Sequence, residues 1–352
     1  MLTQKEIGPA MQRRAILAIL AMACAFAAGT AQAASQALID AAKRDGRITW
    51  YTTLLVDEAS GPLAAAFEKK YPEIHVEIIR KDGSTHLRNI MDEAKAGAMK
   101  ADVFDGTTTA AFLMKAGIAE PYKPESARDI PARYKDPDGY WTAQVLYFQT
   151  LGYNADLVRP QDAPKTYRDL LDPKWKGKLA WSVEEQLTGG LGFIVNVLDS
   201  MGEERGTEYL TTLANQDIAR IRTGINGVTL ALADKRYAVG VTVDNHHARI
   251  ADEKGAHVNW VAIAPVLGLS NNIGLIKGAP HPNAARLLID FNLSIEGQTV
   301  LKNGNHIPAS EKVEAADPSL KRGFAVNYIS PEKGVAYTEK GLAVYRRIFG
   351  NP

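Results

Sequence analysis

The sequence predicts an α/β protein of two lobes, in which each lobe is a mainly parallel sheet flanked by helices and crossing strands join the lobes. Two separate series of alternating strand-like and helix-like segments predict the two sheets, because parallel strands need helical crossovers between them. A long β-prone run at 145–152 (VLYFQTLG) stands between the two series and predicts a crossing strand. The chain of 352 residues is long enough for two hydrophobic cores.

The first series predicts the first lobe, which we expect at 34–150 plus 264–310. Buried or alternating apolar patterns predict strands, and apolar residues at helical spacing predict helices. Pro72 ends one helix, since proline lacks the N–H that a helix interior needs. Ser84 is a candidate N-cap for the next helix. The predicted strands are 47–51, 75–79 and 101–104, and the predicted helices are 58–71, 85–96 and 108–116.

The second series predicts the second lobe, at 151–263. A return crossing is expected at 270–276, followed by an amphipathic helix that starts at Pro282, where a missing N–H costs nothing. The remaining segment, 311–352, is expected to be helical near 337–348 and to pack on the lobes. The predicted strands of this lobe are 179–182, 218–221, 238–243 and 258–263, and its predicted helices are 189–201, 227–234 and 246–254.

Residues 1–33 have the features of a cleaved secretory signal peptide. Two arginines at 13 and 14 precede an apolar run at 15–28, and 31–33 (AQA) gives an A-x-A cleavage pattern. The run is shorter than the ~20 apolar residues of a membrane-spanning helix. We therefore expect export to the periplasm. Cys24, the sole cysteine, is expected to leave with the signal rather than to carry a lipid, because the residues before it do not match a lipoprotein box.

Composition and motifs exclude several functional classes. The formal net charge of +1 gives no support for binding to nucleic acid or to a membrane surface. Without a cysteine after residue 33, the predicted mature chain has no thiol chemistry and no cysteine metal site. The zinc-protease pattern H-E-x-x-H, the hydrolase elbow G-x-S-x-G and the Walker loop are all absent from the sequence.

Eight segments resemble the extracellular solute-binding proteins of the ferric-ion-binding type, which are components of ABC transporters. The resemblance covers nearly all of the predicted mature chain, and 169–178 (DLLDPKWKGK) is its most specific block. The other segments are 50–53 (WYTT), 67–72 (FEKKYP), 101–103 (ADV), 152–154 (GYN), 254–261 (KGAHVNWV), 278–285 (GAPHPNAA) and 294–298 (SIEGQ).

The resemblance implies a type II periplasmic-binding fold, capture of a small solute between two hinged lobes, and delivery to a membrane permease with its ATPase. No cofactor and no enzymatic activity are expected, and the protein is expected to be a monomer. Two alternatives stay open on the residues alone. One is a periplasmic hydrolase or lyase on the same scaffold, with Asp244, His246 or His247 as its base. The other is a sensory protein that docks on a membrane receptor.

Residues at the carboxyl ends of the predicted strands are the candidate ligand-binding residues. Open parallel sheets bind ligands at this edge, where helix N-termini expose unpaired N–H groups. Arg222 has a planar fork of donors that suits a carboxylate or phosphate. Tyr147 lies on the predicted crossing strand. The complete set is Thr52, Thr53, Ser84, Thr85, Thr107, Thr108, Tyr147, Trp181, Ser182, Arg222, Thr223, Asp244, Asn245 and His246.

The adjacent pair His246 and His247 decides what is expected of the ligand. In the iron-binding members that this chain resembles, a tyrosine pair stands at this point. Imidazole suits a hard ferric ion less well than phenolate or carboxylate does, so we expect a small organic or phosphorylated anion. Ferric iron stays open as a transported ligand, and only in that case are His246 and His247 candidate metal ligands.

Overall fold

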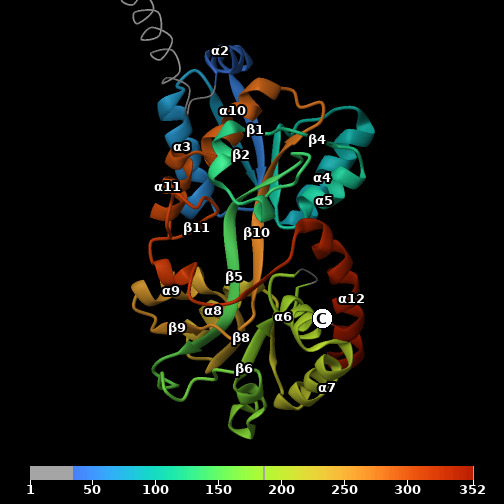
Figure 1. The fold of residues 1–352 in the computed structure, drawn as a ribbon, viewed down its shortest axis with the longest axis vertical. Helices are drawn as coiled ribbons and strands as arrows, with labels where there is room; N and C mark the ends of the chain where they lie inside the picture. The colour runs from blue at the N-terminus through green and yellow to red at the C-terminus, as the bar shows by residue number, and fades with distance from the viewer. Residues whose placement is uncertain (1–34, 185–186, 352) are drawn as a thin grey trace, which may run out of the picture.

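The structure is a computed structural model that describes residues 35–184 and 187–351. The predicted signal peptide lies outside the described residues. Two α/β lobes lie one above the other, and the long strands β5 (Thr142–Asn154) and β10 (Val266–Ile276) run between them (Figure 1). The predicted fold class, two lobes with mainly parallel sheets joined by crossing strands, is confirmed.

The upper lobe of Figure 1 surrounds three parallel strands. β1 pairs with β2 on one side and with β3 on the other, and the buried side chains of Trp50, Phe67 and Phe291 belong to its core. Its strands are β1 (Arg47–Thr52), β2 (His75–Arg80), β3 (Val103–Gly106) and β4 (Ala119–Glu120), and its helices are α2 (Gln36–Asp45), α3 (Gly61–Lys70), α4 (Gly83–Ala96), α5 (Thr109–Lys115), α10 (Pro282–Leu293) and α11 (Ile295–Asn303).

The lower lobe has its own parallel strands and its own core. β6 pairs in parallel with both β7 and β8, and α6 is buried along most of its length. A Cβ on Gly192 would lie 2.0 Å from the Leu187 carbonyl oxygen. Only glycine therefore allows α6 to pack this closely against the backbone of Leu187. The strands are β6 (Leu179–Ser182), β7 (Ala219–Ile221), β8 (Val239–Asp244) and β9 (Val258–Val261), and the helices are α6 (Gly190–Met201), α7 (Glu203–Leu213), α8 (Gly224–Ala233) and α9 (Asn245–Glu253).

The crossing strands make one sheet out of the two lobes. In the order β2-β1-β3-β10-β5-β8-β6-β7, β10 and β5 are antiparallel neighbours at the centre. β10 also pairs with β3 of the upper lobe, and β5 with β8 of the lower lobe. The short strands β11 (Ile307–Pro308) and β12 (Val326–Tyr328) flank β5 and β10. A two-strand connection of this kind is where lobes hinge when they close on a ligand.

The last helix, α12 (Pro331–Phe349), packs along α6 and also reaches α5 of the upper lobe (Figure 1). Glu332 accepts a hydrogen bond of 2.8 Å from the indole N–H of Trp141. The helix is longer than the predicted 337–348. Ser330 caps its start by accepting from the Lys333 N–H, and Pro331 occupies the first helical position.

The sequence analysis placed one helix cap wrongly and missed some of the helices. Asp82, not Ser84, is the N-cap of α4, because the carboxylate accepts from the Thr85 N–H. Helices α7 and α11 were not predicted, since their sequences are polar and α11 follows α10 with only Ser294 between them. Within the described residues, no helix combines the length and the apolar character that spanning a membrane requires.

Candidate ligand-binding site

A cavity of about 570 Å³ lies between the lobes and is lined from both of them. The upper lobe contributes residues at the carboxyl ends of its strands, and the lower lobe contributes residues that follow β6, β7 and β8. His306, after α11, and Thr338, on α12, complete the lining. The polar lining residues are Thr53, Arg80, Asp82, Ser84, Thr107, Thr108, Thr109, Tyr147, Glu184, Thr188, Thr223, Asn226, Asp244, His246, His247, His306 and Thr338.

The upper wall is held by a saturated hydrogen-bond network around Asp105 at the end of β3. Its Oδ1 accepts from the Thr53 N–H at 2.8 Å and from the Thr53 hydroxyl at 2.9 Å. Its Oδ2 accepts from the Trp50 indole N–H at 3.0 Å. Asn271, on crossing strand β10, donates to both Asp105 and Thr53. The network therefore fixes Thr53 to the hinge strand and to the sheet at once.

Asp82 is fully committed to capping α4. It accepts from the Ser84 hydroxyl at 2.6 Å and from the N–H and hydroxyl of Thr85 at 2.9 and 2.7 Å. Burial opposes its ionisation, but these hydrogen bonds outweigh burial and hold the pKa of Asp82 well below its usual range. The carboxylate stays charged and has its lone pairs occupied.

The four helices described in the lower lobe begin without a side-chain cap hydrogen bond, and the N-cap residues of two of them, α8 and α9, line the cavity. The caps of α8 and α9 are Thr223 and Asp244, and neither side chain bonds to its helix. Glu184 lies beside the start of α8, since a Cβ on Gly224 would be 3.0 Å from its Oε1. A carboxylate therefore lies at the start of both helices, Glu184 at α8 and Asp244 at α9, and that of Asp244 makes no hydrogen bond to its helix.

On the lower-lobe side, the cavity is lined by a buried cluster of polar side chains that lack hydrogen-bond partners. Among the described residues, Asp244 Oδ1, both ring nitrogens of His246 and His306, and Nδ1 of His247 have no hydrogen bond. The rings of His246 and His247 are 4.1 Å apart between centroids, and those of His246 and His306 are 5.4 Å apart. The Asp244 Oδ2 lies 3.7 Å from His247 Nδ1, too far for a hydrogen bond.

Burial controls the charge of this cluster. It lowers the pKa of His246 well below its usual value, that of His247 to about 3 and that of His306 to about 4, with neighbouring histidines adding to the effect on the first two. Burial also raises the pKa of Asp244 to about 7. At neutral pH the imidazoles are therefore uncharged, and each offers one donor and one acceptor.

Eight of the predicted binding residues line the cavity together. They are Thr53, Ser84, Thr107, Thr108, Tyr147, Thr223, Asp244 and His246, and His247 lines it as well.

Six predicted residues are not among those that line the cavity. Thr52 and Ser182 are fully buried behind it, and Thr85 bonds to Asp82. Trp181 packs on Phe349, with 4.6 Å between ring centroids. Asn245 donates to the Leu320 carbonyl at 2.8 Å, and Arg222 lies exposed after β7. Successive side chains of a strand point to opposite faces of the sheet, so a residue at the end of a strand can have its side chain directed away from the cavity.

The sequence interpretation missed several lining residues. Arg80 ends β2 and could have been found by the strand-end rule that selected the threonines. Glu184 and Thr188 follow β6 by a few residues. His306 and Thr338 lie far along the chain, and no local pattern in the sequence indicates that they reach this cavity.

Comparisons with known proteins identify the family of this chain. The family model described as bacterial extracellular solute-binding protein matches residues 98–332. This chain belongs to the family of bacterial extracellular solute-binding proteins. The match spans the end of the upper-lobe sheet, both crossing strands and the whole lower lobe.

Two curated proteins are similar to this chain in sequence. An uncharacterized protein of Haemophilus influenzae is 24% identical, with 88% of this chain and 92% of that protein covered. A Salmonella typhimurium periplasmic protein named for 2-aminoethylphosphonate binding is 26% identical, with 64% of this chain and 67% of that protein covered.

Two solved structures share the fold. Iron-bound HitA from Pseudomonas aeruginosa superposes with a TM-score of 0.72 at 22% identity, covering 86% of this chain and 99% of that one. AfuA from Actinobacillus pleuropneumoniae, with fructose-6-phosphate bound, has a TM-score of 0.68 at 20% identity, covering 86% and 98%. The same fold therefore holds ligands as different as a metal ion and a sugar phosphate.

Proposed function

We propose that this protein is the periplasmic receptor of an ABC importer, and that it captures a small organic or phosphorylated anion between its lobes. The observation that carries the proposal is the cavity of about 570 Å³ lined by both lobes, because closure around such a cavity encloses a small solute. The relatives' names support the transport role. Delivery to a membrane permease and its ATPase follows from that role.

The upper wall supplies donors for an anion. Arg80, at the end of β2, brings the only Lys or Arg side chain in the described lining, and Thr107 and Thr108, after β3, bring hydroxyls. An arginine fork pairs well with carboxylates and phosphates. We therefore place the anionic group of the solute against the upper lobe.

Bare ferric iron fits the lining less well. The described residues contain no group of three or more His, Cys, Asp or Glu side chains placed to hold a metal ion. The imidazoles of the cluster are soft partners for a hard ion, and Tyr147 is the only phenol in the described lining. If iron is the cargo, a chelating anion has to bring most of its ligands.

We infer binding without chemical conversion. A hydrolase on this scaffold needs a nucleophile within hydrogen-bond reach of a base. Among the described residues, Asp244 Oδ1, both ring nitrogens of His246 and Nδ1 of His247, which belong to the three candidate bases, make no hydrogen bond to a hydroxyl. The solute is therefore expected to leave the cavity unchanged.

A thermal-shift screen of the ligand-stripped protein tests this function. The panel holds carboxylates, phosphonates, sugar phosphates, thiamine, polyamines and ferric iron with citrate. A solute at 100 times its Kd stabilises the folded state by ~2.7 kcal/mol. We expect an organic anion to raise the melting temperature and mass spectrometry to recover it unchanged. Conversion of the solute would overturn the receptor function, and a shift with iron alone would overturn the organic ligand.

A further inference from the structure

The charged side chains that line the cavity do not suit a solute that is only an anion. One cation, Arg80, faces three carboxylates, Asp82, Glu184 and Asp244, within the described lining. Asp82 is occupied by its hydrogen bonds to Ser84 and Thr85. Of the two lower-lobe carboxylates, Asp244 has an Oδ1 without a hydrogen-bond partner among the described residues, and Glu184 lies beside the start of α8.

Asp244 is the carboxylate whose burial most requires a partner. The residue is 3% exposed, and its Oδ1 has no hydrogen-bond partner among the described residues. Its Oδ2 lies 3.7 Å from His247 Nδ1, which is too far for a hydrogen bond. Leaving a buried carboxylate unpaired costs several kcal/mol in principle. A side chain that faces the cavity at this cost has its missing partner in the ligand.

The part of the chain that the structure describes supplies no cation to Asp244. The titratable groups around it are Tyr147 from β5, His246 and His247 from α9, and His306 from the segment after α11. Burial keeps all three imidazoles neutral at neutral pH, and burial together with the charges of Asp105 and Asp244 keeps the phenol protonated by raising its pKa. The positive charge that Asp244 needs must come from the solute.

Neutral imidazoles fit the same kind of group. Each ring nitrogen that carries no proton accepts a hydrogen bond. His246 and His306 each have such an acceptor without a partner. A primary ammonium has three donors at tetrahedral angles, so it can bond to Asp244 and to imidazole nitrogens together.

We propose that the solute is a zwitterion whose primary ammonium binds to Asp244 and the adjacent imidazoles, while its anionic group binds to Arg80 and the threonine hydroxyls of the upper lobe. This inference rests on the proposed receptor function and names the class of its solute. The two lobes then hold opposite ends of the molecule, so that binding draws them together.

Matched pairs of compounds test the inference by calorimetry on the ligand-stripped protein. The pairs are 2-aminoethylphosphonate with ethylphosphonate, β-alanine with propanoate, and taurine with ethanesulfonate, and ethylamine carries the ammonium alone. At least one zwitterion is expected to bind about tenfold or more tightly than both its amine-free partner and ethylamine, as a charged hydrogen bond predicts. If no zwitterion shows this preference, the inference is wrong.

Two cavity variants and one control locate the ammonium. Asp244→Asn is expected to reduce the preference for the amine toward one, and Glu184→Gln, at a half-buried position, to reduce it less. Asp252→Asn makes the same chemical change on α9 outside the cavity lining and is expected to keep the preference. An unchanged preference in Asp244→Asn would overturn the assignment of Asp244.

The outcome separates this inference from the receptor function. If a solute of the wider panel binds with no dependence on an amine, the receptor function stands and the zwitterion is wrong. If no solute in either set binds, the receptor function fails, and the inference fails with it.

Discussion

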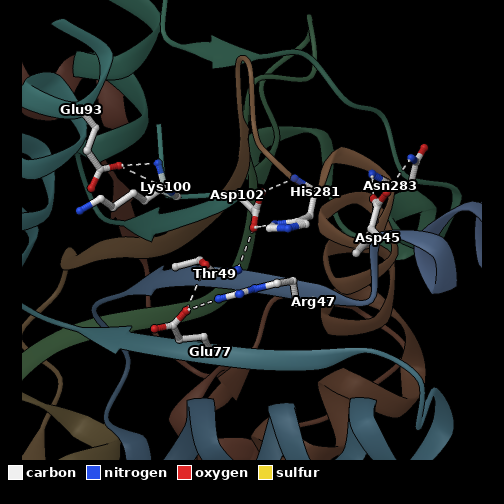
Figure 2. A network of polar contacts seen from close by, with 11 residues as sticks. Asp45, Arg47, Thr49, Glu77, Glu93, Lys100, Asp102, His281 and Asn283 are labelled. Carbon is white, nitrogen blue, oxygen red and sulfur yellow. Dashed lines mark hydrogen bonds and ion pairs between the residues drawn. The ribbon is translucent and has the colours of Figure 1, made fainter. Parts of the chain in front are cut away.

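Two buried aspartate–histidine groups lie at opposite ends of strands, and their environments differ completely. Asp102, just before β3, is fully buried and accepts from the Thr49 N–H at 2.8 Å, the His281 N–H at 2.7 Å and the His281 ring at 2.9 Å (Figure 2). Asp244, at the end of β8, is as deeply buried and has no hydrogen bond to the histidines beside it.

The difference follows from the direction of the strands. Asp102 stands at the amino end of the parallel strands, where the chain itself supplies donors and the carboxylate ties loops to the sheet. Asp244 stands at the carboxyl end, where open α/β sheets bind their ligands. The same residue types therefore stabilise the fold at one end of the strands, and at the other end we propose that they bind a solute.

Removing Asp102 is expected to have the largest effect on stability. Asp102→Ala leaves the buried N–H of Thr49 and the partly buried N–H of His281 unpaired, which should cost about 3 kcal/mol of unfolding free energy. Urea denaturation measures this loss, and the solute preference should stay unchanged. A loss below ~1 kcal/mol would show that the two regions do not differ as described.

The affinity for a zwitterion is expected to fall as the pH is lowered through the pKa of Asp244. Burial raises that pKa to about 7, so acid protonates the carboxylate and removes the partner of the ammonium. The loss approaches about tenfold per pH unit below the pKa. Calorimetry with β-alanine between about pH 6 and pH 8 is suitable, since its own charges are constant there. An affinity of the unaltered protein that does not change with pH would contradict the role of Asp244. In the Asp244→Asn variant, by contrast, the affinity is expected not to change with pH.

Asp244→Asn is expected to stabilise the protein without solute. Because burial raises the pKa of Asp244, its ionised form destabilises the folded state above the usual aspartate pKa, and this penalty is complete above about pH 7. The neutral amide avoids the penalty, so the melting temperature should rise by roughly 2–4 °C, or ~1 kcal/mol, near pH 8. Below about pH 4 the gain should vanish, since both states are then protonated. A lower melting temperature near pH 8 would mean that the carboxylate is already paired.

The smallest effect is expected at the exposed edge of the network in Figure 2. Arg47 and Glu77 form an ion pair of 3.1 Å whose side chains are 57% and 44% exposed. Arg47→Ala should change the unfolding free energy by less than ~0.5 kcal/mol. A cost comparable to that of Asp102→Ala would show that burial is not what separates the two kinds of contact.

Much of the fold could be predicted from the sequence, because the patterns that specify it are local. The alternation in 75–79 gave β2, and the apolar run 145–152 gave the core of β5. Asp82 was missed as a cap since aspartate and serine are equally good caps and stand two residues apart. The chain around α7 gave no clear apolar stripe.

The residues of the candidate site also fall into those that could be predicted from the sequence and those that could not. Strand ends located Thr53, Thr107, Thr108 and Asp244 within the cavity, whereas Trp181 turned into the core, where its indole packs on Phe349. His306 reaches the cavity from a segment about 60 residues beyond His246, and nothing in the sequence pattern indicates that approach.

The sequence by itself determined the two-lobed α/β architecture, the family and the edge of the sheets where we propose that a solute binds, because hydrophobic periodicity and short motifs are properties of neighbouring residues. Only the tertiary structure decided which polar groups are paired. Asp102 and Asp244 are alike in sequence, and their difference comes from donors that distant segments bring to one and not to the other. Burial then sets the charge of each group, which is why the nature of the solute follows from the packing.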